Sequence, residues 1–325
     1  MSEGDLRADP TTAALARLRA DLGAKPTAEA WPRGVVGASS AGGTACYGYP
    51  EIAGYWLHWA CRRDDVGDST GDAVVDWLQQ TYKHYRGWPT RIGEEARAYA
   101  DGSYLFDQVM LWFGLWQWGT MRRSATATAL ADCAWEQAQQ FVHAGGLVAA
   151  RGAKNTRWSG QIGPFLLKAC ARAQRGNGGL GVASRQALPT LVAAALARPH
   201  EQAHPQLYAI EGLIELGECG AAAQALRALI ATHGGIGEVR ESVGAGARRS
   251  DVLAQLLRAA LVLDLVDRTD PAWKALAGEL AARVDARGRV PFAAPGDDCP
   301  TWAALFAEQA LSLWRGQKLS DRGLV

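Results

Sequence analysis

Two carboxylates stand inside strongly apolar stretches of this sequence. Glu51 follows Tyr49 in the run YPEIAGY, and Asp107 lies in the run YLFDQVMLWFG. Burial of an unpaired charge is costly, so a carboxylate in such a stretch needs a partner or a function. Paired carboxylates supply a general acid together with a base or a nucleophile in glycoside chemistry. We therefore predict Glu51 and Asp107 as catalytic partners, with Tyr49 as a third catalytic residue beside them.

Further polar and aromatic side chains occur near the starts of other apolar stretches. Aromatic faces stack on sugar rings, and arginine forks bind carboxylate or phosphate groups. Acidic residues in a first helical turn are also ordinary dipole partners, so helix capping is the alternative role of Asp251, Asp298 and His204. We add Glu211 and Asp298 to the catalytic candidates. The candidate substrate-binding residues are Tyr47, Trp88, Arg91, Tyr104, Arg157, Trp158, His204, Tyr208, Arg248, Asp251 and Trp302.

The stretches that carry these residues predict six helices that are apolar nearly all round. Such helices must be buried on every side. Their starts recur about every 50 residues, which indicates an internal repeat. The predicted inner helices are Tyr49–Cys61, Tyr104–Trp118, Trp158–Ala171, Pro205–Leu216, Asp251–Leu265 and Thr301–Trp314.

Six amphipathic helices alternate with the apolar ones. Each has one apolar stripe and one polar face, which is typical of a helix that covers a buried layer. The alternation predicts an all-α fold: an (α/α)6 toroid of six helical hairpins with an inner and an outer ring, formed by residues 1–325 as a single domain. The predicted outer helices are Thr12–Leu22, Asp72–Arg86, Ala125–His143, Ser184–Ala197, Ala221–His233 and Pro271–Val284.

The connections that lead from outer to inner helices are long and rich in glycine. Loops at one end of a rigid scaffold are where functional sites usually lie. These loops meet the N-termini of the inner helices, whose dipoles and free N–H groups favour an anionic or strongly polar ligand. The segment Gly176–Gly181 matches G-x-G-x-x-G, but it follows a helix, so we predict a turn and no dinucleotide site.

Composition excludes several classes of protein. Lys and Arg number 34 and Asp and Glu 33, so the net charge is +1, without the basic surplus of a nucleic-acid binder. With 48% apolar and 21% charged residues, the chain is not disordered. The acidic N-terminus is no secretory signal, Gln108–Met121 is too short to span a bilayer, and the six cysteines form no CxxC pair. We expect a soluble, cytoplasmic protein with reduced thiols, no membrane span, no cofactor and no metal.

The segment Tyr49–Tyr55 resembles the YPE-x-x-GY signature of toroid proteins encoded among bacterial polysaccharide genes. Those proteins are similar to the toroids of the terpenoid-cyclase and six-hairpin-glycosidase superfamily. The segments Ser103–Gln108 and Thr301–Trp314 resemble their second and closing inner helices, so the likeness spans most of the chain. The resemblance implies the toroid fold and a setting in glycan metabolism.

These observations favour a carbohydrate-active enzyme that acts on an anionic oligosaccharide or sugar conjugate. Hydrolysis requires two carboxyl groups about 5–9.5 Å apart, whereas lyase or epimerase chemistry at a uronic acid requires a Tyr or His base. A catalytically silent toroid that binds a glycan or a protein is the second hypothesis. Terpenoid-cyclase or prenyltransferase-like chemistry is the third, because Asp297 and Cys299 form an Asp-x-Cys pair that could contribute to a metal site.

Overall fold

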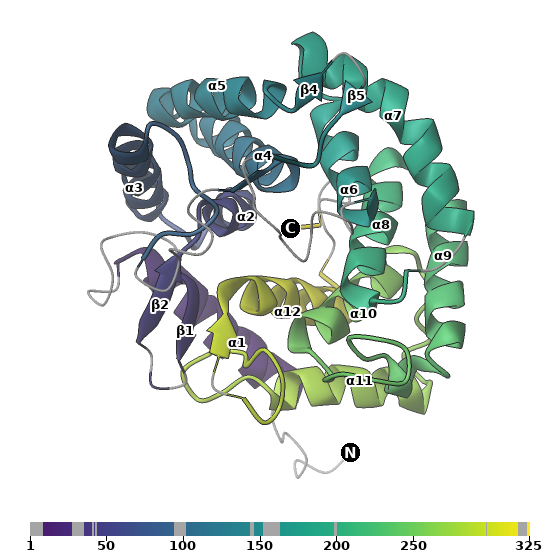
Figure 1. Cartoon of the computed structure of the whole chain (residues 1–325). Helices are drawn as coiled ribbons and strands as arrows, with labels where there is room; N and C mark the ends of the chain where they lie inside the picture. The colour runs from purple at the N-terminus through teal and green to yellow at the C-terminus, as the bar shows by residue number, and fades with distance from the viewer. Residues whose placement is uncertain are drawn as a thin grey trace.

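The computed structural model describes residues 9–27, 36–40, 42, 44–93, 102–143, 146–151, 163–197, 200–296, 298–317 and 324–325. The helices in this part of the chain form two concentric rings (Figure 1). The inner ring consists of α2 (Pro50–Ala60), α4 (Leu105–Arg122), α6 (Gly163–Ala173), α8 (Ala203–Leu216), α10 (Ser250–Val262) and α12 (Thr301–Trp314). The outer ring consists of α1 (Pro10–Ala24), α3 (Asp68–Tyr85), α5 (Ala125–Gln139), α7 (Gly178–Ala197), α9 (Cys219–Thr232) and α11 (Pro271–Ala282).

The inner ring is closed, which confirms the predicted (α/α)6 toroid. Each inner helix contacts the next one, α12 contacts both α10 and α2, and α1 packs against α12. Every residue of α2 is buried, whereas α3 buries a single stripe that includes Val74, Val75 and Leu78. This difference in burial is the physical reason that the apolar and amphipathic patterns separated the two rings correctly.

Several helix ends are fixed by side chains that the sequence displays. Asp9 accepts a hydrogen bond from the backbone N–H of Thr11 and begins α1, and Asp270 does the same for α11 through Ala272. The largest error in helix bounds concerns α7. It begins at Gly178 rather than at the predicted Ser184. The glycine-rich segment therefore forms a turn before the helix, as predicted, and then the first turn of the helix itself. Its Pro189 lies inside the helix, on an exposed face.

Helices α2 and α4 cross at two glycines, and this crossing positions the site. A Cβ added at Gly54 would lie 2.6 Å from the carbonyl oxygen of Met110, and one at Gly114 would lie 2.0 Å from the carbonyl oxygen of Gly54. Only glycine allows two helix backbones to approach so closely. The crossing brings the first turn of α2 against the first turn of α4, where the two predicted catalytic carboxylates lie.

Short strands at the N-terminal ends of the inner helices were not predicted. Strands β1 (Val36–Ser40), β2 (Ala45–Gly48) and β7 (Asp298–Pro300) form an antiparallel sheet in the order β2-β1-β7. Strand β1 precedes α2 and β7 precedes α12, so this sheet ties the first hairpin to the last (Figure 1). Two further pairs join β3 (Ser103–Tyr104) to β6 (Ala150–Arg151) and β4 (Val142–His143) to β5 (Gly146–Leu147). Strands of two to five residues leave too short a pattern to identify from sequence.

One helix in the described part of the chain, α7, is long and apolar enough to cross a membrane by length and composition. It lies in the outer ring, where it packs against α6 and also contacts α8 and α9. Its apolar residues Leu180 and Leu188 are buried against the inner ring. These contacts are those of an outer-ring helix.

Candidate active site

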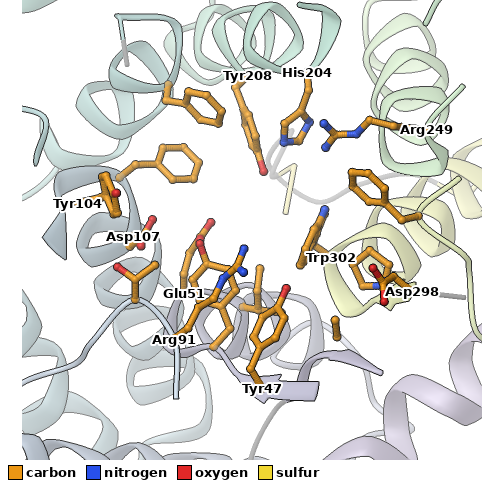
Figure 2. Close-up of a pocket in the computed structure, with 18 of the residues that line it drawn as sticks. Tyr47, Glu51, Arg91, Tyr104, Asp107, His204, Tyr208, Arg249, Asp298 and Trp302 are labelled. Carbon is orange, nitrogen blue, oxygen red and sulfur yellow. The ribbon is translucent and has the colours of Figure 1, made fainter. Parts of the chain in front are cut away.

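A cavity of about 650 Å³ opens at the N-terminal ends of the inner helices. Its walls come from the first turns of α2, α4, α8 and α12 and from the connecting segments beside them (Figure 2). This is the end of the toroid at which the long loops predicted a site. The residues named from the sequence that line it are Tyr47, Tyr49, Glu51, Arg91, Tyr104, Asp107, His204, Tyr208, Asp298 and Trp302.

Glu51 and Asp107 are in direct contact on one side of the cavity. Their side chains are hydrogen bonded to each other, and Glu51 also accepts a hydrogen bond from the Tyr49 hydroxyl. Glu51 is 6% exposed and Asp107 is 9% exposed, so neither carboxyl is well hydrated. Burial raises the pKa of Glu51 to about 7, although the hydrogen bonds from Tyr49 and Asp107 partly offset this rise. Burial and the adjacent Glu51 charge raise the pKa of Asp107 well above its usual range.

Such a pair titrates as a unit and holds one proton at neutral pH. Two carboxyl groups in contact cannot flank a glycosidic bond at the separation of about 5–9.5 Å that an acid and a nucleophile or base require. The expectation that Glu51 and Asp107 divide these roles across one bond is therefore not met. The pair is suited to act as a single proton donor.

Aromatic rings and an arginine surround the acid pair. The guanidinium carbon of Arg91 lies 4.4 Å from the ring centroid of Tyr47 and 5.7 Å from that of Tyr49. The Tyr49 ring meets Trp302 edge-on at 6.4 Å. Burial raises the pKa of Tyr47 to about 12, so its hydroxyl stays protonated as a hydrogen-bond donor. A cavity with aromatic faces and polar edges is suited to a sugar ring.

The opposite side of the cavity is organised by a buried carboxylate that does not line it. Asp251 accepts two hydrogen bonds from Arg249, at 3.0 and 2.6 Å, and one from the indole N–H of Trp302 at 3.0 Å. Burial alone would raise the pKa of Asp251, but the Arg249 charge outweighs it and holds that pKa well below the usual range. Asp251, predicted to bind substrate, instead fixes two cavity residues, Arg249 and Trp302.

His204 lines the cavity and is not a helix cap. Gln202 is the N-cap residue of α8, and its side chain makes no capping hydrogen bond. Nδ1 of His204 lies 2.6 Å from Oε1 of Gln255 and 3.8 Å from Oδ2 of Asp251. Its ring packs edge-on against Tyr208 at 4.7 Å.

Glu211 lies beneath the cavity in a buried ionic cluster rather than in its wall. Its carboxylate is 2.7 Å from Nζ of Lys168 and is also bound by Arg258, and all three side chains are fully buried. Burial would raise the pKa of Glu211, but Arg258 and Lys168 hold it below its usual value. Because its charge is fully paired, Glu211 has a structural function, which the sequence did not distinguish from a catalytic one.

The other predicted residues fall in three places. Trp88 is buried outside the cavity, where its indole N–H donates to the Leu78 carbonyl at 2.9 Å. Arg248 pairs with Glu279 of α11 at 2.6 Å and does not line the cavity. Arg157 and Trp158 lie outside the described residues.

Several cavity residues were missed by sequence reasoning. Phe106 and Thr90 are each next to a predicted residue, Asp107 and Arg91, and Phe165 lies in the first turn of an inner helix. Their positions next to predicted residues or at a helix start could have identified them. Arg249 directly follows the predicted residue Arg248, so adjacency was the signal there too. The missed lining residues are Ala38, Cys46, Ile52, Thr90, Phe106, Ala149, Phe165, Glu241, Arg249, Phe292 and Pro300.

Within the described residues, no group of three His, Cys, Asp or Glu side chains is placed to hold a metal ion. Cys299 is buried in β7, where it pairs with Ser39 of β1. Its proposed partner Asp297 lies outside the described residues. None of the six cysteines, all of which are described, forms a disulfide.

Known structures share this fold at low sequence identity. An unsaturated glucuronyl hydrolase from Bacillus sp. GL1, responsible for the degradation of glycosaminoglycan, is 16% identical with a TM-score of 0.62, over 94% of this chain and 96% of that one. A novel α-amylase from Clostridium perfringens is 11% identical with a TM-score of 0.65, over 97% and 100%. A cellobiose 2-epimerase from Spirochaeta thermophila is 13% identical with a TM-score of 0.62, over 96% and 98%.

No protein-family model and no curated protein sequence matches the chain. The neighbours are toroids of the six-hairpin-glycosidase type, so the fold implied by the YPE-x-x-GY resemblance is confirmed.

Proposed function

We propose that this protein is a carbohydrate-active enzyme that acts on an oligosaccharide by general acid catalysis from the Glu51–Asp107 pair. The observation that supports this proposal is that two buried carboxyls with raised pKa values are hydrogen bonded to each other inside an aromatic-lined cavity. The buried atom Oδ2 of Asp107 has no hydrogen-bond partner in the described part of the chain. A buried polar atom without a partner is expected where a ligand completes the site.

The contact within the pair favours a reaction that needs one proton donor and no separate carboxylate nucleophile. Hydration of an unsaturated uronic acid at the non-reducing end of an oligosaccharide is such a reaction. Protonation of the ring double bond produces a cation that water captures, and the resulting hemiketal opens and releases the rest of the chain. The fold shared with an unsaturated glucuronyl hydrolase supports this choice.

Arg91 supports an anionic substrate. Its guanidinium lies beside the acid pair (Figure 2), and its charge opposes the rise in the pKa of both carboxyls. A substrate carboxylate bound by Arg91 places the neighbouring ring carbons near the proton donor. Replacement Arg91→Gln should raise KM for uronic acid substrates about 10- to 100-fold and leave KM for neutral sugars within about threefold.

The test of the proposed function is turnover of a panel of oligosaccharides. The panel contains 4,5-unsaturated uronyl disaccharides, saturated neutral and uronic glycosides, and reducing disaccharides that report epimerisation. We expect turnover of the unsaturated substrates, and we expect Glu51→Gln and Asp107→Asn each to lower kcat by about 10²–10⁴-fold. Unchanged turnover in both variants on the best substrate would reject the acid pair.

Arg248→Gln is the control, because Arg248 lies just before the start of another inner helix, α10, and does not line the cavity. Turnover of saturated glycosides alone would support a carbohydrate-active enzyme but reject the hypothesis that its substrate is an unsaturated uronic acid. Binding of oligosaccharides without turnover would favour the catalytically silent toroid. We also propose that the enzyme is cytoplasmic, which is supported by six cysteines that form no disulfide, because reduced cysteines are typical of that compartment.

A further inference from the structure

The acid pair faces a histidine across the cavity. His204 stands in the first turn of α8, on the side opposite Asp107 (Figure 2), and is 7% exposed. The proposed reaction transfers a proton to the substrate and also removes one from water. The acid pair supplies the first proton, and the second step needs an acceptor with an available lone pair.

A chain of hydrogen bonds fixes which ring nitrogen of His204 carries its proton. Nε2 of Gln255 lies 3.3 Å from Oε1 of Glu211, whose charge is held by Lys168 and Arg258. An ionised carboxylate only accepts, so Gln255 turns its NH₂ group toward Glu211. Its carbonyl oxygen then faces Nδ1 of His204 at 2.6 Å, and this oxygen only accepts. The hydrogen therefore sits on Nδ1, and Nε2 keeps its lone pair.

The surroundings of His204 keep the ring neutral. Burial lowers its pKa to about 4, and the charge of Asp251 offsets this only in part. Asp251 is neutralised by Arg249, whose own charge further disfavours the imidazolium form. On its own helix the ring meets the Tyr208 phenol edge-on. The charge of Glu211 also raises the pKa of His204, but this effect is weaker than that of Asp251, and Glu211 is already paired with Lys168 and Arg258.

We infer that His204 is the catalytic base of the proposed reaction, acting through Nε2, with Gln255 and Glu211 as positioning residues. The inference rests on the proposed function and assigns the second proton transfer. The acid pair gives its proton to one carbon of the double bond, whose π electrons form the new C–H bond. The oxygen of a water molecule bonds to the adjacent carbon while Nε2 accepts a proton from that water. The proton gained by His204 and the one lost by the pair are then exchanged with solvent.

Nitrogen NMR tests the tautomer independently of any substrate. The chain contains six histidines, so ¹⁵N-histidine labelling gives a small set of signals, and His204→Gln assigns the one of interest. At pH 7 we expect Nδ1 protonated and Nε2 unprotonated in the wild type, with protonation only below about pH 5. Gln255→Leu should remove the preference for this tautomer. A hydrogen on Nε2, or an imidazolium at pH 7, would overturn the inference.

Kinetics test the role of the lone pair. In His204→Gln we expect kcat to fall about 10²–10⁴-fold with KM within about threefold, and the acidic limb of the pH profile near pH 4 to disappear. Added imidazole should restore part of the turnover of His204→Ala, which a merely structural role would not allow. His84→Gln, on an exposed face of α3, is the control.

The two hypotheses fail in different ways. If the wild type turns over none of the oligosaccharides, the proposed function fails while the NMR tautomer is still measured. If the wild type is active and His204→Gln retains its kcat, the assignment of His204 is overturned and the acid pair stands.

Discussion

At the scale of single residues, the acid pair makes the fold less stable at the pH where it is useful. The pKa values of Glu51 and Asp107 are raised in the folded state, so the folded protein retains protons that the unfolded chain releases. Stability associated with the pair is therefore greatest at pH 4 and falls as the pH rises through about 7. This is the sign expected of buried carboxylates that are not paired with cations.

Asp107→Asn should consequently raise stability at pH 8 by about 1–3 kcal/mol while it lowers activity. The reason is that the variant removes a buried carboxyl that must keep its proton in the folded state at a pH where the unfolded chain releases it. Thermal unfolding at pH 4 and pH 8 measures the effect, which should be small at pH 4. Asp298→Asn, at an exposed carboxylate of the same cavity, should leave both transitions unchanged. Destabilisation of Asp107→Asn at pH 8 would contradict the shared proton.

At the scale of helices, the site depends on the glycine crossing of α2 and α4. Gly114→Ala introduces a Cβ at 2.0 Å from the Gly54 carbonyl oxygen, so the two helices must separate. We expect a loss of about 1–3 kcal/mol or more in unfolding free energy and a large loss of turnover, because the carboxyls move apart. Gly278→Ala in α11, where an added Cβ meets nothing within 4 Å, should instead be neutral or stabilising. Denaturant unfolding and kcat compare the two; full activity in Gly114→Ala would show that the crossing does not position the pair.

The same crossing shows what the sequence could and could not predict. The apolar and amphipathic patterns predicted all twelve α-helices of the described residues. The YPE-x-x-GY motif contains both Glu51 and Gly54, which is one of the two glycines at the crossing. The contact between Glu51 and Asp107 depends on how closely two helices pack, which a pattern along one chain does not report. Likewise, Glu211 finds its partners Lys168 and Arg258 on other inner helices. A buried carboxylate with partners that distant in sequence cannot be told from a catalytic one before the fold is known.

At the scale of the whole molecule, residues Leu324 and Val325 lie at the centre of the ring (Figure 1) and are 0% and 2% exposed. A main-chain oxygen of Val325 accepts hydrogen bonds from Lys168 of α6 at 2.9 Å and Arg258 of α10 at 3.1 Å. The Val325 N–H donates to Gln309 of α12 at 3.2 Å. These contacts tie three inner helices together beneath the cavity and satisfy part of the buried cation cluster.

Removal of Leu324 and Val325 should therefore lower the unfolding free energy by about 3–5 kcal/mol, because buried cations lose acceptors and an apolar side chain is lost from the core. Val325→Ala keeps the main-chain contacts and should have a clearly smaller effect. Denaturant unfolding of both variants measures the difference. Equal stability of the shortened chain and the full chain would show that this segment does not brace the ring.

The most direct test of the account is the ionisation of the acid pair itself. Carboxyl ¹³C NMR of the glutamate-labelled protein, with the Glu51 signal assigned through Glu51→Gln, follows that carboxyl as the pH is raised. We predict a titration near pH 7 in the wild type, in accord with the raised pKa of about 7 for Glu51, and a Glu51 pKa that stays raised in Asp107→Asn, because burial causes the rise and the amide can still donate to Glu51. A Glu51 signal that titrates near pH 4 to 5 in both proteins, the usual range of an isolated glutamate, would contradict the shared proton and with it the proposed acid.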